Sequence, residues 1–134
     1  MAIRMKKILV VGRPYSNGGD FLIYDRIMRV LQAACPEAQI TLNLQNDAQF
    51  DIDQINAYDA IVTGGGGAQY AEPYVKTSFF YQHFDEITTP IHYMGTGLYG
   101  ADGEDSTLYE YPYSDEMISY FNQVVERGGQ LATR

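Results

Sequence analysis

A glycine-rich turn between a predicted strand and a predicted helix carries the first residues that could do chemistry. The segment 10–31 begins VVGRPYSNGGDF and then continues with helical spacing of apolar residues. Helix starts at such turns often bind phosphate through their free backbone N–H groups. Here Asp20 stands where the helix is expected to begin, and a carboxylate satisfies those groups and opposes the helix dipole. We therefore expect Asn17, Gly19 and Asp20 to hold a ligand that donates hydrogen bonds, such as a sugar. The alternative is that Asp20 only caps the helix.

A single arginine lies close to this turn. Arg13 follows the first predicted strand by one residue. A guanidinium there is well placed to bind a carboxylate or a phosphate group of a ligand. The alternative is an ordinary surface arginine with no ligand.

The second glycine-rich segment is the GGGG at 64–67, which follows another predicted strand. It lacks the Lys-Ser or Lys-Thr pair that a P-loop requires. We expect Gly65, Gly66 and Gly67 to present backbone N–H groups to a ligand, because glycine permits unusual dihedral angles. Close packing of the loop on its neighbours is the alternative.

The third segment is GTGLYG at 95–100, which matches the spacing of a dinucleotide-binding fingerprint. The residues after it do not look helical, so it lacks the context of that fingerprint. We interpret Gly95 and Gly97 as a turn that lets the backbone approach a ligand. Tyr99 begins a tyrosine-rich loop, whose side chains suit either stacking on a sugar or a protein interface.

The elements that position these loops alternate between strand and helix along the chain. This alternation predicts an α/β fold: a Rossmann-like or flavodoxin-like three-layer domain with a mostly parallel sheet of about five strands. Ligands of such sheets bind outside the carboxyl ends of the strands, where all three loops are expected. The predicted strands lie at 7–12, 39–44, 60–67, 90–95 and 130–134, and the predicted helices at 20–35, 51–57, 73–87 and 115–127.

Composition narrows the classes of partner. The 134 residues are enough for one domain with a real core. A net charge of −8 with nine basic residues argues against nucleic acid and anionic membranes. We expect no membrane insertion and a cytoplasmic location, because no long apolar run is present. The single Cys35, with His83 and His92, offers no metal-ligand spacing and no catalytic triad.

Three short motifs stand in order along the chain: N-x-G-D at 17–20, DAIVTGGGG at 59–67 and PIHYMGTG at 90–97. Together they resemble the polysaccharide pyruvyl transferase family. The closing LATR at 131–134 resembles the family's strand that ends in an arginine, which is normally followed by an acidic residue. The order and spacing of these motifs agree across nearly the whole chain.

The resemblance implies two Rossmann-like domains that face a cleft, as in GT-B glycosyltransferases. It implies transfer of the enolpyruvyl unit of phosphoenolpyruvate to a sugar of a cell-surface polysaccharide or its precursor, with no cofactor. The chain resembles the front domain, which supplies mainly the acceptor side, so a second domain is an expected partner. Asp20 would orient or deprotonate the acceptor hydroxyl, and Arg134 would contact the donor.

Two alternatives stay open at this point. One is half of a sugar-nucleotide glycosyltransferase. The other is a standalone Rossmann-like module that binds a ligand or a partner without catalysis.

Overall fold

The computed structural model describes residues 4–12, 18–44, 50–64, 72–96 and 113–133. Within these residues, five parallel strands form one sheet in the order β2-β1-β3-β4-β5. This order is that of flavodoxin-like doubly wound sheets. The predicted α/β fold with a parallel sheet is therefore confirmed. The strands are β1 Lys7–Val11, β2 Gln39–Asn43, β3 Ala60–Gly64, β4 Ile91–Thr96 and β5 Leu131–Thr133.

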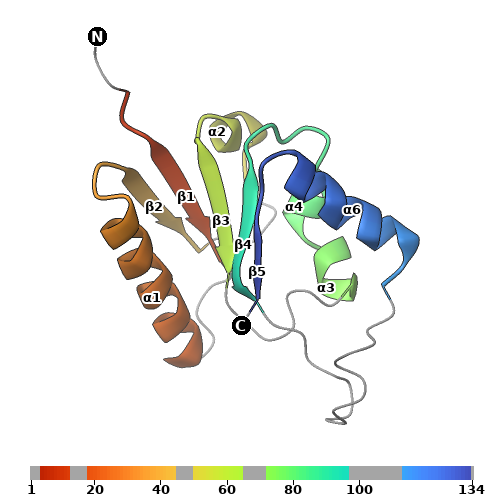
Figure 1. Ribbon diagram of the computed structural model, residues 1–134, viewed down its shortest axis with the longest axis horizontal. Coiled ribbons are helices and arrows are strands. Elements are labelled where there is room, and N and C mark those ends of the chain that lie inside the picture. Colours follow the sequence, from red (N-terminus) through yellow and green to blue (C-terminus); the bar gives the residue numbers. More distant parts are fainter. Residues whose placement is uncertain (1–3, 13–17, 45–49, 65–71, 97–112, 134) are drawn as a thin grey trace.

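Helices cover both faces of the sheet (Figure 1). One face carries α1, and the opposite face carries α2, α3, α4 and α6. The chain runs from β1 outward to β2 and then returns to β3 on the other side of β1. The strand order thus reverses between β1 and β3, which is the switch point of the sheet. The helices are α1 Gly18–Ala34, α2 Ile52–Asn56, α3 Glu72–Lys76, α4 Phe79–Gln82 and α6 Asp115–Glu126.

Strand β1 is apolar from Ile8 to Val11 because these residues are buried, on one face of the sheet or the other. Ile8 and Val10 pack in the cluster beneath α1, whereas Leu9 and Val11 belong to the larger cluster on the opposite face. A central strand of a parallel sheet has this unbroken apolar pattern, since helices cover both of its sides.

The buried side of α1 agrees only in part with the apolar spacing of the sequence. Among the apolar residues at helical spacing, Ile27 is buried and Ile23 and Leu31 are partly buried, whereas Leu22 and Val30 are exposed. Tyr24, which is not part of that spacing, is buried with them. The helix is therefore rotated so that its tyrosine, which is amphipathic, faces the sheet.

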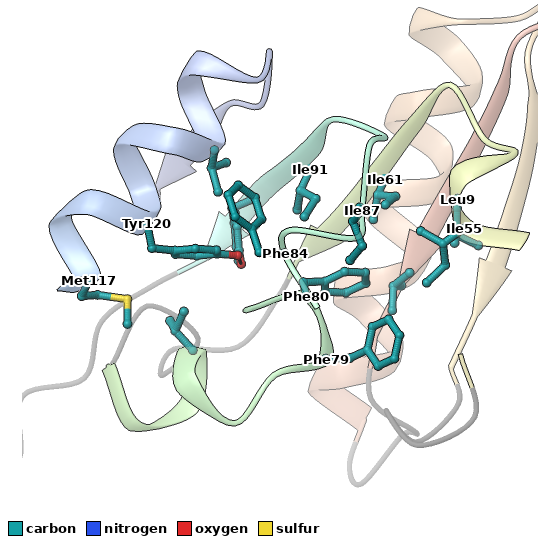
Figure 2. Close-up of a cluster of buried hydrophobic side chains, with 14 residues drawn as sticks. Leu9, Ile55, Ile61, Phe79, Phe80, Phe84, Ile87, Ile91, Met117 and Tyr120 are labelled. Carbon is teal, nitrogen blue, oxygen red and sulfur yellow. Dashed lines mark hydrogen bonds between the residues drawn. The ribbon is translucent and has the colours of Figure 1, made fainter. Parts of the chain in front are cut away.

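The larger core lies on the face opposite α1 and is rich in aromatic rings. Figure 2 shows rings from α4 and the turn after it between side chains of the sheet and of α6. Inside this core the hydroxyls of Tyr93 and Tyr120 are 2.7 Å apart and share a hydrogen bond. Burial raises the pKa of Tyr120. The labelled members are Leu9, Ile55, Ile61, Phe79, Phe80, Phe84, Ile87, Ile91, Met117 and Tyr120.

The prediction of one helix over 73–87 is wrong, because the structure has two short helices there. Ser78 separates α3 from α4 with an extended backbone (φ −73°, ψ 146°), and its side chain accepts a hydrogen bond from Tyr81 N. The Ser78 hydroxyl also donates to Val75 O at 2.7 Å. Serine side chains compete in this way with the backbone bonds of a helix interior.

Candidate functional site

The candidate site is the carboxyl edge of the sheet around the switch point. Strand β1 ends here at Val11, β3 ends at Gly64, and α1 begins at Gly18. Doubly wound sheets bind their ligands at this place. Of the predicted site residues, Gly19, Asp20 and Gly95 are described. The others lie outside the described residues: Arg13, Asn17, Gly65, Gly66, Gly67, Gly97, Tyr99 and Arg134.

Asp20 lies in the first turn of α1, as its third residue. It is therefore not the residue before the helix, and the prediction that it caps α1 from outside is wrong. The helix begins earlier than expected because Gly18 and Gly19 are already helical. A carboxylate in the first turn still interacts favourably with the positive end of the helix dipole. Asp20 is half-buried, and the two glycines before it are exposed.

Tyr24 ties α1 to the end of β3. Its buried hydroxyl donates a hydrogen bond to the backbone carbonyl of Gly64 at 3.1 Å. Tyr24 is not among the predicted site residues. Its spacing of four from Asp20, which places both residues on the same side of α1, is the sequence signal for it. This bond fixes the first turns of α1 relative to the switch point.

Gly64, the first of the four glycines, is required by packing. A Cβ atom there would lie 2.4 Å from the carbonyl oxygen of Met94 and 2.6 Å from Cδ1 of Ile27. Close packing, the alternative to ligand binding, therefore explains why position 64 is a glycine. At Gly64, the end of β3 consequently lies too close to β4 and to the middle of α1 for a larger side chain.

Gly95 lies in an irregularity near the end of β4. The pairing of β4 with β5 shifts register between Met94 and Thr96, and Gly95 has a φ of 65°. A Cβ atom at Gly95 would meet nothing within 4 Å. Glycine is thus favoured here by backbone conformation rather than by space. Bulges of this kind are frequent beside functional sites, where they redirect the end of a strand.

A cluster of charged and polar side chains joins α3 to α6, and we call it the α3–α6 cluster. Glu72 accepts hydrogen bonds from Ser114 N at 3.0 Å and from Ser114 Oγ at 2.7 Å. Lys76 Nζ lies 2.8 Å from Glu72 Oε1 and 3.2 Å from Glu116 Oε2. The Tyr81 hydroxyl bonds to Glu116. Lys76 and then Ser114, as hydrogen-bond donors, lower the pKa of Glu72 to about 2.

Two residues of the α3–α6 cluster come just after the glycine-containing segments that are predicted to form the candidate site. Glu72 comes directly after the segment 65–71, and Ser114 comes two residues after the segment 97–112. The hydrogen bonds between these two residues therefore join the chain just beyond both glycine-containing segments. Since the members of the cluster satisfy one another, we assign it a positioning role.

The two histidines lie away from the switch point. His83 Nδ1 lies 2.8 Å from Glu86 Oε1, and the His83 ring stacks on Phe79 with centroids 4.4 Å apart. His92 lies within β4, and burial lowers its pKa. Among the described residues, no group of three or more His, Cys, Asp or Glu side chains could hold a metal ion. No described helix has the length and apolar character needed to cross a membrane.

Comparisons with known proteins bear on the fold. No protein-family model matches the chain, and no curated protein matches it. The chain is similar to a solved structure whose title reads "Crystal structure of conserved protein from Enterococcus faecalis V583". It shares 14% sequence identity with a TM-score of 0.55, and the match covers 98% of this chain and 92% of that chain. At this identity the likeness shows the α/β fold.

Proposed function

We propose that this chain is the acceptor-side domain of a polysaccharide pyruvyl transferase. The observation that carries the proposal is the place of Asp20. Its carboxylate lies in the first turn of α1, at the switch point where doubly wound sheets bind ligands. A carboxylate there accepts a hydrogen bond from a hydroxyl, whereas it opposes a phosphate.

The proposed reaction requires one group that acts on the sugar acceptor and another that protonates the phosphoenolpyruvate donor. Protonation of the methylene carbon of phosphoenolpyruvate leaves a positive charge on the adjacent carbon, which bears the phosphate. A sugar hydroxyl attacks this cationic carbon, and the hydroxyl loses its proton. A second hydroxyl of the sugar then replaces phosphate, which closes the pyruvate ketal. In this proposal Asp20 orients the attacking hydroxyl and accepts its proton as a general base. The general acid comes from a second domain.

The donor requires cations, because it carries a carboxylate and a phosphate group. The net charge of −8 opposes such a ligand unless basic groups are local to it. The proposal assigns this contact to Arg134, with Arg13 as a second candidate cation from its place in the sequence.

Titration calorimetry of the isolated chain with phosphoenolpyruvate tests the donor assignment. We expect heat of binding that Arg134→Ala abolishes. Heat from sugar nucleotides in place of phosphoenolpyruvate would favour the glycosyltransferase alternative. No heat from either class would contradict the donor assignment and favour a binding module without catalysis.

A matched pair of variants tests Asp20. The pair is Asp20→Asn and Asp25→Asn, because Asp25 is also on α1 but pairs with Arg29 at 2.9 Å. A charged hydrogen bond contributes about 1.5–3 kcal/mol, so Asp20→Asn should weaken sugar binding at least about tenfold. Asp25→Asn should leave the affinity unchanged. Equal affinities of the two variants would refute the role of Asp20.

A further inference from the structure

A groove lies on the face of the sheet opposite α1, over the neighbouring strands β1 and β2. Its volume is about 360 Å³. Lys7 and Leu9 of β1 and Gln39 and Asn43 of β2 form its floor, and residues in and around α2 form a wall. It lies outside the candidate site at the carboxyl edge.

The sequence of β2 explains why no described helix packs over this groove. Ile40 and Leu42 pack with the cluster beneath α1. Gln39 and Asn43 alternate with them, so they face the opposite side of the sheet. Helix α2 on that side has five residues. The polar face of an edge strand therefore borders a short helix instead of a packed layer.

The lining of the groove is suited to a neutral, hydroxyl-rich ligand. The side-chain amides of Gln39, Asn43 and Gln54 each combine donors with an acceptor, as sugar hydroxyls do. Tyr58 adds a phenol, which has an apolar face and a polar tip. Phe50 adds an aromatic ring.

The ring of Phe50 is held in place by its neighbours. Its centroid lies 5.3 Å from that of Phe79 and 6.0 Å from that of Phe80. A ring that is already ordered loses little further freedom when a ligand packs on it. It therefore forms a prepared apolar surface at one side of the groove.

The charges of the lining balance one another. Lys7 is basic and Asp51 is acidic. The Asp51 carboxylate already caps α2, since it accepts hydrogen bonds from Asp53 N at 2.9 Å and Gln54 N at 3.2 Å. The described residues of the lining thus have no net charge with which to select an anion or a cation.

We propose that the groove binds one neutral sugar residue. Its volume falls at the lower end of the range for small-molecule sites, which is suitable for a single sugar ring. As a subsite for a saccharide acceptor, the groove rests on the proposed function. The two regions adjoin, because Asn43 ends β2 in the groove and its carbonyl accepts a hydrogen bond from Gly12 N at 3.1 Å.

The test is an NMR titration of the ¹⁵N-labelled full chain with four neutral sugars. The probes are D-glucose, D-galactose, D-mannose and N-acetyl-D-glucosamine, with inorganic phosphate as the anionic comparison. We expect at least one sugar to shift the side-chain amide signals of Gln39, Asn43 and Gln54 with saturation. We expect inorganic phosphate to leave them in place.

Variants connect the signal to the groove. Gln54→Ala should weaken the sugar affinity at least about threefold, and so should Tyr58→Phe, which keeps the ring and removes the hydroxyl. Gln82→Ala is the control, since Gln82 is an exposed glutamine of α4 outside the groove lining. It should leave the affinity unchanged.

The outcomes separate this proposal from the proposed function. The proposal that the groove binds a sugar would be overturned if no sugar, up to about 100 mM, shifted the side-chain amide signals of the groove. Shifts confined to the backbone amides of Gly12 and Gly64 would overturn it as well. If sugars shift the amide signals of the groove but phosphoenolpyruvate does not bind to the chain, the sugar site is supported and the proposed transferase function is contradicted.

Discussion

Replacing Gly64 by alanine should destabilise the fold through the end of β3. The new Cβ atom would lie 2.4 Å from the carbonyl oxygen of Met94 and 2.6 Å from Cδ1 of Ile27. Ile27 is a flexible side chain, but the Met94 carbonyl belongs to the neighbouring strand β4, which pairs with β3 at this level. Relief of the clash therefore requires a shift of paired backbone.

The size of the effect follows from this geometry. Overpacking of a filled core costs about 1–3 kcal/mol, and a clash with backbone belongs in the upper part of that range. We expect Gly64→Ala to lower the free energy of unfolding by about 2–3 kcal/mol. For a domain of this size, the melting temperature should fall by about 6–15 °C.

Thermal and urea unfolding followed by circular dichroism would measure this loss. Gly18→Ala is the matched control, because a Cβ atom there meets nothing within 4 Å and the residue begins α1. Alanine favours a helix over glycine by up to about 1 kcal/mol, so this variant should melt at or above the wild-type temperature. Equal melting temperatures of the two variants would refute the close approach of β3, β4 and α1.

Two further predictions concern pH. The lowered pKa of Glu72, about 2 against an ordinary 4.5, means that its bonds stabilise the fold fully above pH 4.5 and that this contribution is lost as the pH falls toward 2. The difference in melting temperature between the wild type and Glu72→Gln should therefore be constant above about pH 5 and shrink below it, and a constant difference at all pH values would contradict the ion pairing. Burial lowers the pKa of His92 from 6.5, so the folded state binds fewer protons than the unfolded chain, and stability should fall as the pH drops below 6.5. Urea unfolding between pH 5 and 8 should show that His92→Gln removes this loss, and parallel curves for both proteins would argue against burial of the imidazole.

Local patterns predicted several elements well, and the reasons lie within a few residues of each. The apolar run at 8–11 forms the buried part of a central strand. Asp51, at the start of the helix predicted at 51–57, caps α2. The helix predicted at 115–127 ends at Glu126 with Arg127 as its C-cap, and Gly128 follows at a positive φ of 89°. The strand, the helix cap and the helix end are each determined by nearby side chains and by the backbone of the same segment.

The errors arose where a local pattern allowed two solutions. Apolar residues on several sides of α1 left its buried face partly open: Ile27 is buried as its spacing predicts, but contact with the sheet added Tyr24 and left Leu22 and Val30 exposed. Between residues 73 and 87 the helical spacing was apparent, yet Ser78 ended one helix and began another through its hydroxyl. Burial of Phe79 and Phe80 against the sheet side of the core favours this break.

The sequence by itself determined the α/β class and the parallel sheet, because these follow from periodicity and chain order, and it predicted the carboxyl edge of the sheet as the place for a site. Only the tertiary structure decided the strand order, the bond from Tyr24 to Gly64 and the link from Glu72 to Ser114. The last two join residues that are 40 and 42 positions apart. Such contacts form only when strands from distant parts of the chain pair, and no local propensity encodes which strands will do so.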